Sequence, residues 1–325
     1  MESMVKPKEN FWKGRKVLIT GHTGFKGCWL SLWLHSLGAN ITGIGLEPET
    51  TPSLFNQLNL GSLISNNYII DIRDAHKLKK IVGEIEPEVV FHLAAQPLVI
   101  DSYIDPIGTW STNLIGSLNL LESLRNLNNI CAIVMITTDK VYKNHEWDFG
   151  YRENDQLGGH DPYSASKAAC EIAISSWRSS FCGVAENQNP NLAISTARAG
   201  NVIGGGDWAK DRIIPDVIRA LSNNKEILVR NSSSTRPWQH VLEPLSGYIV
   251  LAEKLFYSQP LILENLKNPY SSAFNFGPNL EANRSVSELV ETILKHWPGS
   301  WISQSNKKAF HEAGRLDLQV DKAFH

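Results

Sequence analysis

The stretch Lys16-Val-Leu-Ile-Thr-Gly-His-Thr-Gly-Phe-Lys-Gly27 decides the fold of this 325-residue chain. It begins with a continuous apolar run, which is typical of a buried parallel strand. Gly21, Gly24 and Gly27 follow directly, and a helical pattern comes next. Glycines in such a loop let the backbone approach a pyrophosphate, which then lies at the helix N-terminus. The stretch therefore predicts a strand, a dinucleotide-binding loop and a helix.

The helix after this loop is indicated by Trp29 and Trp33, which are four residues apart, and Gly38 is a plausible stop. Further β-rich runs alternate with helical ones, at residues 41–44, 68–70, 89–94, 132–136 and 192–198. Strands separated by helices predict an α/β fold with a doubly wound parallel sheet of the Rossmann type. From Asn201 onward the alternation breaks up. We therefore expect a dinucleotide-binding domain at residues 1–200 and a smaller C-terminal α/β substrate lobe at residues 201–325.

The composition is that of an ordinary globular enzyme, with 42% hydrophobic residues, 20% charged residues and a net charge of −2. The balanced charge argues against a nucleic-acid partner, and no apolar run reaches the ~18 residues of a membrane span. The first ten residues contain no apolar signal segment, which favours a cytoplasmic location. The four cysteines lack CxxC spacing, so we expect neither a disulfide nor a metal site.

The cofactor preference can be judged from the region of the second strand. Residues 41–67 contain no Lys or Arg, so a ribose 2′-phosphate would find no cation there, and NAD is favoured over NADP. Lys26, inside the glycine loop, is the one residue that could reverse this preference. Asp71 and Ile72 end the third strand and are candidates to contact the adenine. Glu47 is a candidate for a ribose hydroxyl, although Pro48 beside it indicates a turn instead.

A candidate proton acceptor lies further along the chain. Tyr163 and Lys167 share one face of a predicted helix, one turn apart. A neighbouring ammonium and a cationic nicotinamide favour the phenolate, which can take a proton from an alcohol. The simpler alternative is that Tyr163 and Lys167 are exposed neighbours on a surface helix. Against this, Asp161-Pro162 begins the helix at the end that is expected to face the ligand pocket.

Three polar residues end the fifth predicted strand. Thr138 can donate a hydrogen bond to the alcohol oxygen, and Asp139 can act as an acid, although a loop or capping aspartate is the simpler alternative. Lys140 can act as a base if it loses its proton, or it can anchor the substrate by its charge. An acid and an amine at this position offer proton transfers that a plain dehydrogenase does not need.

These residues occur within longer motifs: His92-Leu-Ala-Ala-Gln-Pro97, Thr112-Asn113, Thr138-Asp-Lys140, Asp161-Pro-Tyr-Ser-Ala-Ser-Lys167, Arg198-Ala-Gly-Asn-Val-Ile-Gly-Gly-Gly-Asp-Trp208 and Arg236-Pro-Trp-Gln-His-Val241. With them, nearly the whole chain resembles the extended short-chain dehydrogenase/reductase family, and within it the nucleotide-sugar 4,6-dehydratases. The Lys at position 140 resembles the branch that acts on CDP-glucose, since the dTDP-sugar branch has Glu there. Relatives of this kind continue beyond the position of His325, so the resemblance implies an incomplete substrate lobe.

The resemblance implies a reaction for each catalytic candidate. Tyr163 would take the proton of the 4-hydroxyl while hydride passes to NAD. Lys140 would then remove the proton on carbon 5, and Asp139 would protonate the departing 6-hydroxyl. The hydride would return to carbon 6, and carbon 5 would be reprotonated. The product would be CDP-4-dehydro-6-deoxy-D-glucose, a precursor of deoxysugars for surface polysaccharide such as lipopolysaccharide O-antigen. Two alternatives stay open: another nucleotide-sugar dehydratase or epimerase, and a non-catalytic NAD-binding scaffold or sensor.

The resemblance also implies the remaining site residues and a partner. The expected cofactor contacts are Gly21, Thr23, Gly24, Phe25, Lys26, Gly27, Asp71, Ile72, Leu93, Ala94, Ala95, Gln96, Thr112, Tyr163 and Lys167. The expected substrate contacts are Ser102, Asn201, Arg212, Arg230, Arg236 and His240. The helices around residues 106–127 and 162–182 would pair across a two-fold axis, so a homodimer or a dimer of dimers is expected.

Overall fold

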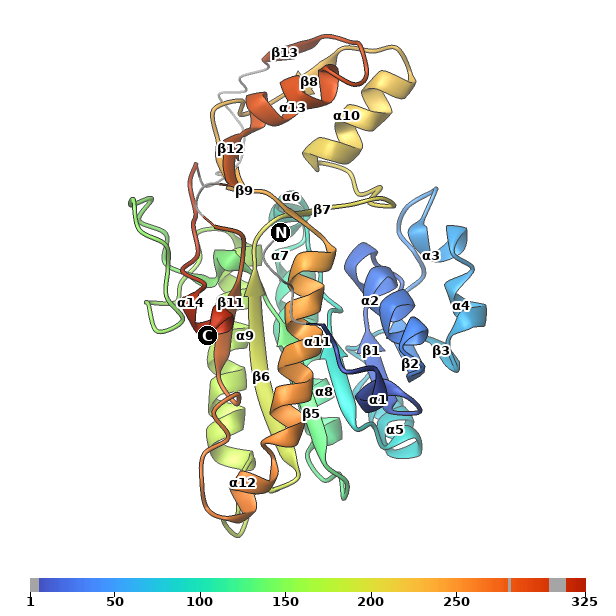
Figure 1. The fold of residues 1–325 in the computed structure, drawn as a ribbon, viewed down its shortest axis with the longest axis vertical. Coiled ribbons are helices and arrows are strands. Elements are labelled where there is room, and N and C mark those ends of the chain that lie inside the picture. The colour runs from blue at the N-terminus through green and yellow to red at the C-terminus, as the bar shows by residue number, and fades with distance from the viewer. Residues whose placement is uncertain (1–5, 280–281, 304–313) are drawn as a thin grey trace.

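The computed structural model describes residues 6–279, 282–303 and 314–325. Its centre is a seven-stranded sheet in which every neighbouring pair is parallel (Figure 1). In spatial order the strands are β3 (Asn66–Ile69), β2 (Asn40–Gly45), β1 (Lys16–Thr20), β4 (Val89–His92), β5 (Cys131–Ile136), β6 (Leu192–Ala199) and β11 (Ala273–Phe276). The order reverses between β1 and β4, as in a doubly wound Rossmann sheet, so the predicted fold class is confirmed.

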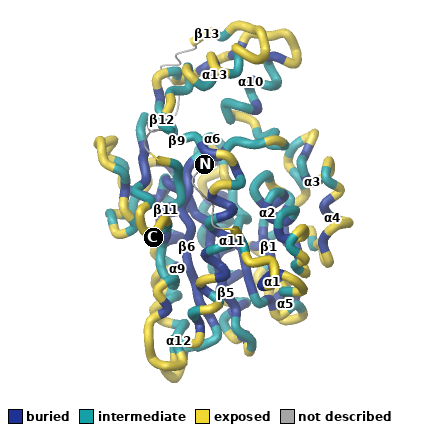
Figure 2. Tube along the Cα trace, in the orientation of Figure 1, coloured by how far each residue is buried: buried dark blue, intermediate teal, exposed yellow. Residues whose placement is uncertain are grey.

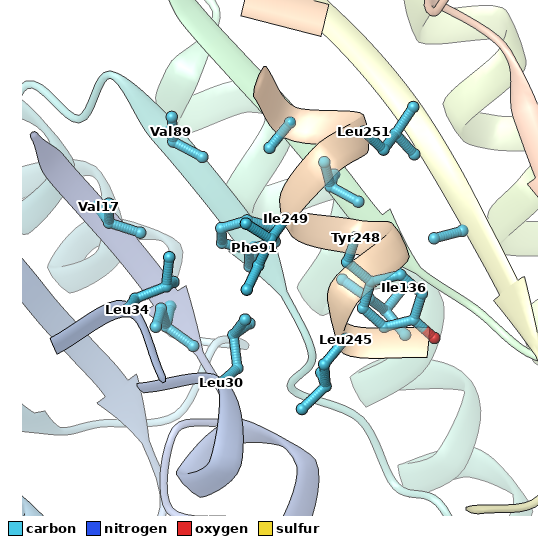
Figure 3. Close-up of a cluster of buried hydrophobic side chains, with 14 of the residues drawn as sticks. Val17, Leu30, Leu34, Val89, Phe91, Ile136, Leu245, Tyr248, Ile249 and Leu251 are labelled. Carbon is cyan, nitrogen blue, oxygen red and sulfur yellow. The ribbon is translucent and has the colours of Figure 1, made fainter. Parts of the chain in front are cut away.

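Helices cover both faces of this sheet, and alternate side chains of each strand point to the two cores. In β1, Val17 and Ile19 belong to one core and Leu18 to the other. The first core is covered by α1 (Glu9–Trp12), α2 (Phe25–Ser36) and α11 (Leu242–Tyr257), and Figure 3 shows α11 side chains packed over the strands. The second core is covered by α5 (Ala75–Ile85), α8 (Ser117–Leu124) and α9 (Pro162–Phe181). Figure 2 shows that burial is concentrated along the strands between these layers.

The helix predicted after the glycine loop is confirmed as α2. It ends at Ser36, and Gly38 two residues later has φ +80°, a left-handed conformation that favours glycine. The N-terminus of α2 points to the carboxyl edge of the sheet, where the loop connects it to β1.

The seventh strand, β11, was not predicted. It comes from the last third of the chain and pairs in parallel with β6, with Phe274 opposite Ala197. Together with α11, it shows that residues after 201 also build the main sheet and its cover. The predicted domain boundary between residues 200 and 201 therefore stays a prediction. It does not separate the sheet from the rest of the chain, because β11 and α11 both follow residue 201.

A smaller α/β lobe lies above the carboxyl edge of the sheet (Figure 1), as the sequence predicts. It consists of α10 (Ile213–Ser222), β8 (Ile227–Val229), α13 (Val286–Leu294) and β13 (Trp301–Ser303). Its own apolar core includes Val217, Leu221, Ile227, Val229 and Val290. The antiparallel pair β9 (Thr235–Pro237) and β12 (Asn283–Ser285) connects this lobe to the sheet domain.

The remaining elements are α3 (Leu54–Gln57), α4 (Leu60–Leu63), α6 (Val99–Ile104), α7 (Pro106–Trp110), the π-helix η1 (Ser111–Gly116), the 3₁₀ turn η2 (Asp139–Val141), β7 (Val202–Ile203), β10 (Gln239–His240), α12 (Pro260–Leu263) and α14 (Asp321–Phe324). Within the described ranges, none of the helices is long and apolar enough to cross a membrane. The prediction about a signal segment was made from the first ten residues. Of these, residues 1–5 lie outside the described ranges.

Candidate active site

The glycine loop is held close to the end of β4. Gly21 has φ +75°, and a Cβ there would lie 2.6 Å from the backbone nitrogen of Ala94. A Cβ on Gly27 would lie 2.0 Å from the carbonyl oxygen of Gly21. Only glycine permits both approaches, and Gly24 is the N-cap of α2. The first turn of α2 therefore opens toward the switch point of the sheet, where an anionic diphosphate is favoured.

A cleft of about 1060 Å³ lies between this edge and the smaller lobe. Most of the predicted site residues line it. From the sheet domain these are Gly21, Thr23, Gly24, Phe25, Lys26, Gly27, Asp71, Ile72, Leu93, Ala94, Ala95, Thr112, Thr138, Asp139, Lys140, Tyr163 and Lys167. The other lining predictions are Asn201, Arg212, Arg230 and Arg236. Glu47 also lines the cleft, beyond the end of β2.

Three residues that were predicted to contact the cofactor or the substrate are not among the residues that line the cleft: Gln96, Ser102 and His240. The Gln96 amide donates to the Leu98 carbonyl and the Thr109 hydroxyl. Ser102 is fully buried, and its hydroxyl donates to the Val99 carbonyl at 2.6 Å. His240 is exposed, and its Nδ1 accepts from the Leu242 backbone nitrogen at 3.3 Å. Local hydrogen bonds that the sequence pattern does not reveal thus engage these groups, and their ligand contacts stay predictions.

The acid and the amine at the end of β5 lie together. Thr138 caps the η2 turn, since its hydroxyl accepts from the Lys140 backbone nitrogen at 3.4 Å, and it donates to Asp139 Oδ1 at 2.9 Å. Lys140 Nζ is 3.6 Å from the same Oδ1. The Asp139 side chain is 3% exposed, whereas that of Lys140 is 24% exposed and reaches into the cleft. One buried carboxylate is therefore paired with a more accessible amine.

The Tyr-Lys pair projects from the first turns of α9. Asp161 caps this helix by accepting from the Ser164 backbone nitrogen at 2.9 Å and from its hydroxyl at 2.6 Å, and Pro162 occupies the first turn. Tyr163 and Lys167 are both buried, and Lys167 Nζ lies 3.4 Å from the Ile136 carbonyl. The cap and the proline therefore fix where the catalytic helix begins.

The expected lowering of the Tyr163 pKa is not found in this structure. Burial raises the pKa of Tyr163 to about 12, which outweighs a hydrogen bond with Thr138 and the positive charge of Arg212. Burial also lowers the pKa of Lys167. The expectation rested on the neighbouring ammonium and on a cationic nicotinamide, whereas loss of water around the phenol dominates here.

Lys26 lies toward the catalytic end of the cleft. Burial lowers its pKa to about 8, Arg212 and Lys167 act in the same direction, and Asp139 opposes them. The charges that act on Lys26 thus belong to the catalytic region. At the end of β2 the lining residue is instead an acid, Glu47, which leaves no cation from residues 41–67 for a 2′-phosphate.

The arginines predicted for the substrate line the cleft on the side of the smaller lobe. Arg212 pairs with Asp207 and Arg230 with Asp211, each at 3.0 Å. Arg236 donates to the Gly314 carbonyl at 3.1 Å. The sequence interpretation missed these acidic partners, although Asp207 is part of the 198–208 motif.

Sequence reasoning also missed a wall of the cleft contributed by the loop after η2. Asn144, His145 and Glu146 line it. The loop is held by the segment Gly314–Gln319, with the Asn144 amide donating to the Arg315 carbonyl at 2.9 Å and the Gly314 nitrogen to Glu146 at 2.6 Å. Trp208 and Trp238 line other parts of the cleft, and their place inside the quoted motifs was the only sequence signal for them.

The glycine loop at the β1 end and the Tyr-Lys pair on the helix after β5 define a dinucleotide-dependent enzyme of the short-chain dehydrogenase/reductase class. A family model described as GDP-mannose 4,6 dehydratase matches residues 18–256. A CDP-glucose 4,6-dehydratase of Salmonella typhimurium is 48% identical over 317 residues, which cover 97% of this chain and 86% of that protein. The chain belongs to the GDP-mannose 4,6 dehydratase family.

Solved structures agree on the fold. An epimerase, Mth375 from Methanothermobacter thermautotrophicus, superimposes with a TM-score of 0.76 at 21% identity, covering 97% of this chain and 87% of that one. DesIV, a dTDP-glucose 4,6-dehydratase from Streptomyces venezuelae with NAD and TYD bound, superimposes with a TM-score of 0.73 at 21% identity, covering 94% and 88%.

Proposed function

We propose that this chain is a CDP-glucose 4,6-dehydratase, converting CDP-D-glucose to CDP-4-dehydro-6-deoxy-D-glucose and water. The observation that carries the proposal is the Asp139–Lys140 ion pair placed in one cleft with Tyr163 and Lys167, beside the glycine loop. An oxidation at carbon 4 needs only the Tyr-Lys pair, whereas loss of water needs an added acid and base. The 48% identity to the Salmonella CDP-glucose 4,6-dehydratase supports the same substrate.

NAD fits the residues present. The backbone of the glycine loop and the first turn of α2 would hold its diphosphate, Asp71 and Ile72 would flank the adenine, and Glu47 would accept from a ribose hydroxyl. The nearby Arg73 is held by Asp71 at 2.6 Å. When bound, NAD supplies the hydride acceptor for carbon 4 and the hydride donor for carbon 6. The NAD bound in the DesIV structure supports this choice.

The protein's own groups supply the proton transfers. Tyr163 takes the proton of the 4-hydroxyl as the phenolate, and the positive charge of the buried Lys167, one turn further along α9, stabilises this phenolate before it is protonated. The ketone at carbon 4 acidifies the hydrogen on carbon 5, which Lys140 removes. Asp139 gives a proton to the departing 6-hydroxyl.

The elimination needs Lys140 neutral and Asp139 protonated at the same time. The two groups lie 3.6 Å apart, so a small movement of the Lys140 side chain to hydrogen-bond distance would let one proton pass from Nζ to Oδ1 and produce both required forms. A glutamate in place of Lys140 would leave two carboxylates there, which would have to share a proton. The lysine therefore makes this site a self-contained acid-base pair.

The substrate assignment is tested by incubating the purified protein with CDP-, dTDP-, UDP- and GDP-glucose in turn and detecting a 4-ketosugar. We expect the CDP-sugar to be converted with the highest kcat/KM. Preferred conversion of another nucleotide sugar would support the alternative of a related dehydratase, and inversion at carbon 4 without loss of water would identify an epimerase. Tight NAD binding with no conversion of any sugar would identify a scaffold or sensor.

We further propose that the chain forms a homodimer through the helices beside the active site. Large apolar side chains are exposed there: Ile104, Ile107, Ile115 and Ile172. They lie on α6, α7, η1 and α9, which pack against one another. Pairing of the helices around residues 106–127 and 162–182 with their copies across a two-fold axis would bury these side chains in a four-helix bundle. The cytoplasmic location expected from the sequence stays a prediction.

Ile172→Lys should therefore convert the dimer to a monomer, because it places a charge in the apolar interface. Light scattering after gel filtration should show the mass halved. The matched control is Ile302→Lys, which changes an equally apolar exposed side chain on β13 of the smaller lobe and should leave the dimer intact. A monomeric wild-type protein, or a dimer that survives the Ile172 change, would contradict this interface.

A further inference from the structure

A buried carboxylate that the mechanism does not use lies one turn beyond Lys167 on α9. Glu171 is 3% exposed and accepts three hydrogen bonds. The Thr137 hydroxyl donates to Oε1 at 2.5 Å, the Thr196 hydroxyl to Oε2 at 2.9 Å, and Arg198 Nη2 to Oε2 at 2.8 Å. Arg198 is itself 3% exposed. The polar groups thus form a compact cluster below the floor of the cleft.

The cluster joins the two elements that carry the catalytic groups. Thr137 directly precedes Thr138 at the end of β5, whereas Glu171 is on α9 with Tyr163 and Lys167. The helix meets this strand end twice, one turn apart: Lys167 Nζ approaches the carbonyl of Ile136, and Glu171 accepts from Thr137. The carboxylate therefore sets how far α9 is shifted along β5.

Arg198 keeps the carboxylate charged in this buried position. Although burial by itself raises the pKa of Glu171, the hydrogen bond and the charge of Arg198 lower it overall. The other amino group of Arg198 donates to the Tyr142 hydroxyl at 2.7 Å and to the Glu153 carbonyl at 2.9 Å. Tyr142 follows Lys140 by two residues, so Arg198 also supports the η2 turn from below.

A buried ion pair is weak as a source of stability, since removing two charges from water costs about as much as their attraction returns. The three hydrogen bonds that the Glu171 carboxylate accepts do, however, hold α9 at a defined distance from β5 and β6. Catalysis is sensitive to such distances, because a misplacement of about 1 Å can cost about 10²-fold in rate.

We propose that Glu171 is a positioning residue, which acts through Thr137 to hold the Tyr163–Lys167 pair of α9 in register with the Thr138–Asp139–Lys140 turn. This inference rests on the proposed dehydratase function. The threonine on β5 is then the functional contact of the carboxylate. Thr196 lies within β6 and precedes no catalytic residue, so its only role is to donate a hydrogen bond to the second carboxylate oxygen of Glu171, Oε2.

The two threonines provide a matched pair of variants that leave the Glu171–Arg198 ion pair intact. Thr137→Val and Thr196→Val each remove one hydroxyl that donates to the same carboxylate, and both sites are buried. We expect Thr137→Val to lower kcat by up to about 10²-fold with KM for CDP-glucose unchanged. Thr196→Val should keep the wild-type kcat, with a similar drop in melting temperature. Thr137→Ser, which keeps the hydroxyl, should restore turnover.

Equal kcat values for Thr137→Val and Thr196→Val, at similar melting temperatures, would overturn the positioning role and leave the proposed function standing. The same holds if Thr137→Val acts on KM alone, since the substrate contact and not the register would then have changed. If the wild-type protein forms no ketosugar from any of the four nucleotide sugars, the proposed function fails first and this inference fails with it.

Discussion

Tyr163→Phe is expected to abolish ketosugar formation while NAD stays bound. Only the phenolic oxygen is lost, and with it the acceptor for the 4-hydroxyl proton, so the ring keeps its packing in the buried first turns of α9. General acid-base catalysis typically contributes about 10²–10⁴-fold, and we expect a loss at the upper end because no later step can proceed. Product assay and extraction of the bound cofactor measure the two parts of this prediction.

Tyr248→Phe is the matched control for this change. Tyr248 is buried in α11 (Figure 3), and among the described residues its hydroxyl has no hydrogen-bond partner. It should therefore keep wild-type activity. Near wild-type turnover by Tyr163→Phe with bound NAD would eliminate Tyr163 as the base.

Lys140→Ala is expected to permit oxidation at carbon 4 but to stop the reaction before water leaves. Addition of CDP-glucose should build up enzyme-bound reduced cofactor, visible by its absorbance, with 6-deoxy product lowered by about 10²–10⁴-fold. Asp139→Asn should stall at a similar stage, because the leaving hydroxyl is no longer protonated. Tyr163→Phe, in contrast, should show no reduced cofactor at all.

Lys140→Arg separates the two roles that the sequence left open for this lysine. A guanidinium keeps the positive charge but stays protonated at working pH, so it can anchor a substrate and cannot remove the carbon 5 proton. If Lys140 is the base, the Arg variant stalls like the Ala variant. If the Arg variant turns over normally, and Lys140→Ala raises KM with kcat unchanged, the lysine is an anchor and another group takes the proton.

The candidate site shows where sequence reasoning was sufficient. The glycine loop and the Tyr163–Lys167 pair act through spacing along one element, and both line the cleft as predicted. Gln96 was assigned from its motif and Ser102 from the resemblance alone, and the structure ties both to nearby backbone or side chains. A motif identifies residues that belong together, but it does not determine which of them face the ligand.

The ionisation of Tyr163 shows a second limit. The expected ionisation followed from the Lys167 ammonium, which the i,i+4 spacing reveals, and from a cationic nicotinamide, whereas in the structure burial raises the pKa of Tyr163. Burial depends on how the rest of the chain packs around α9, which the spacing of two residues on one helix does not reveal.

The sequence by itself determined the parallel sheet from β1 to β6, the loop at its switch point and the polar turn after β5. These features are encoded locally, in continuous apolar runs, glycine positions and residues one helical turn apart. Only the tertiary structure decided that Ala273–Phe276 forms the seventh strand, that Gly314–Gln319 holds the loop beside the cleft, and that Glu171 joins α9 to β5. Each of these depends on contacts between residues far apart in the chain, and neither a strand outside the alternating pattern of the first two hundred residues nor a lone buried carboxylate carries a periodic signal of its partner.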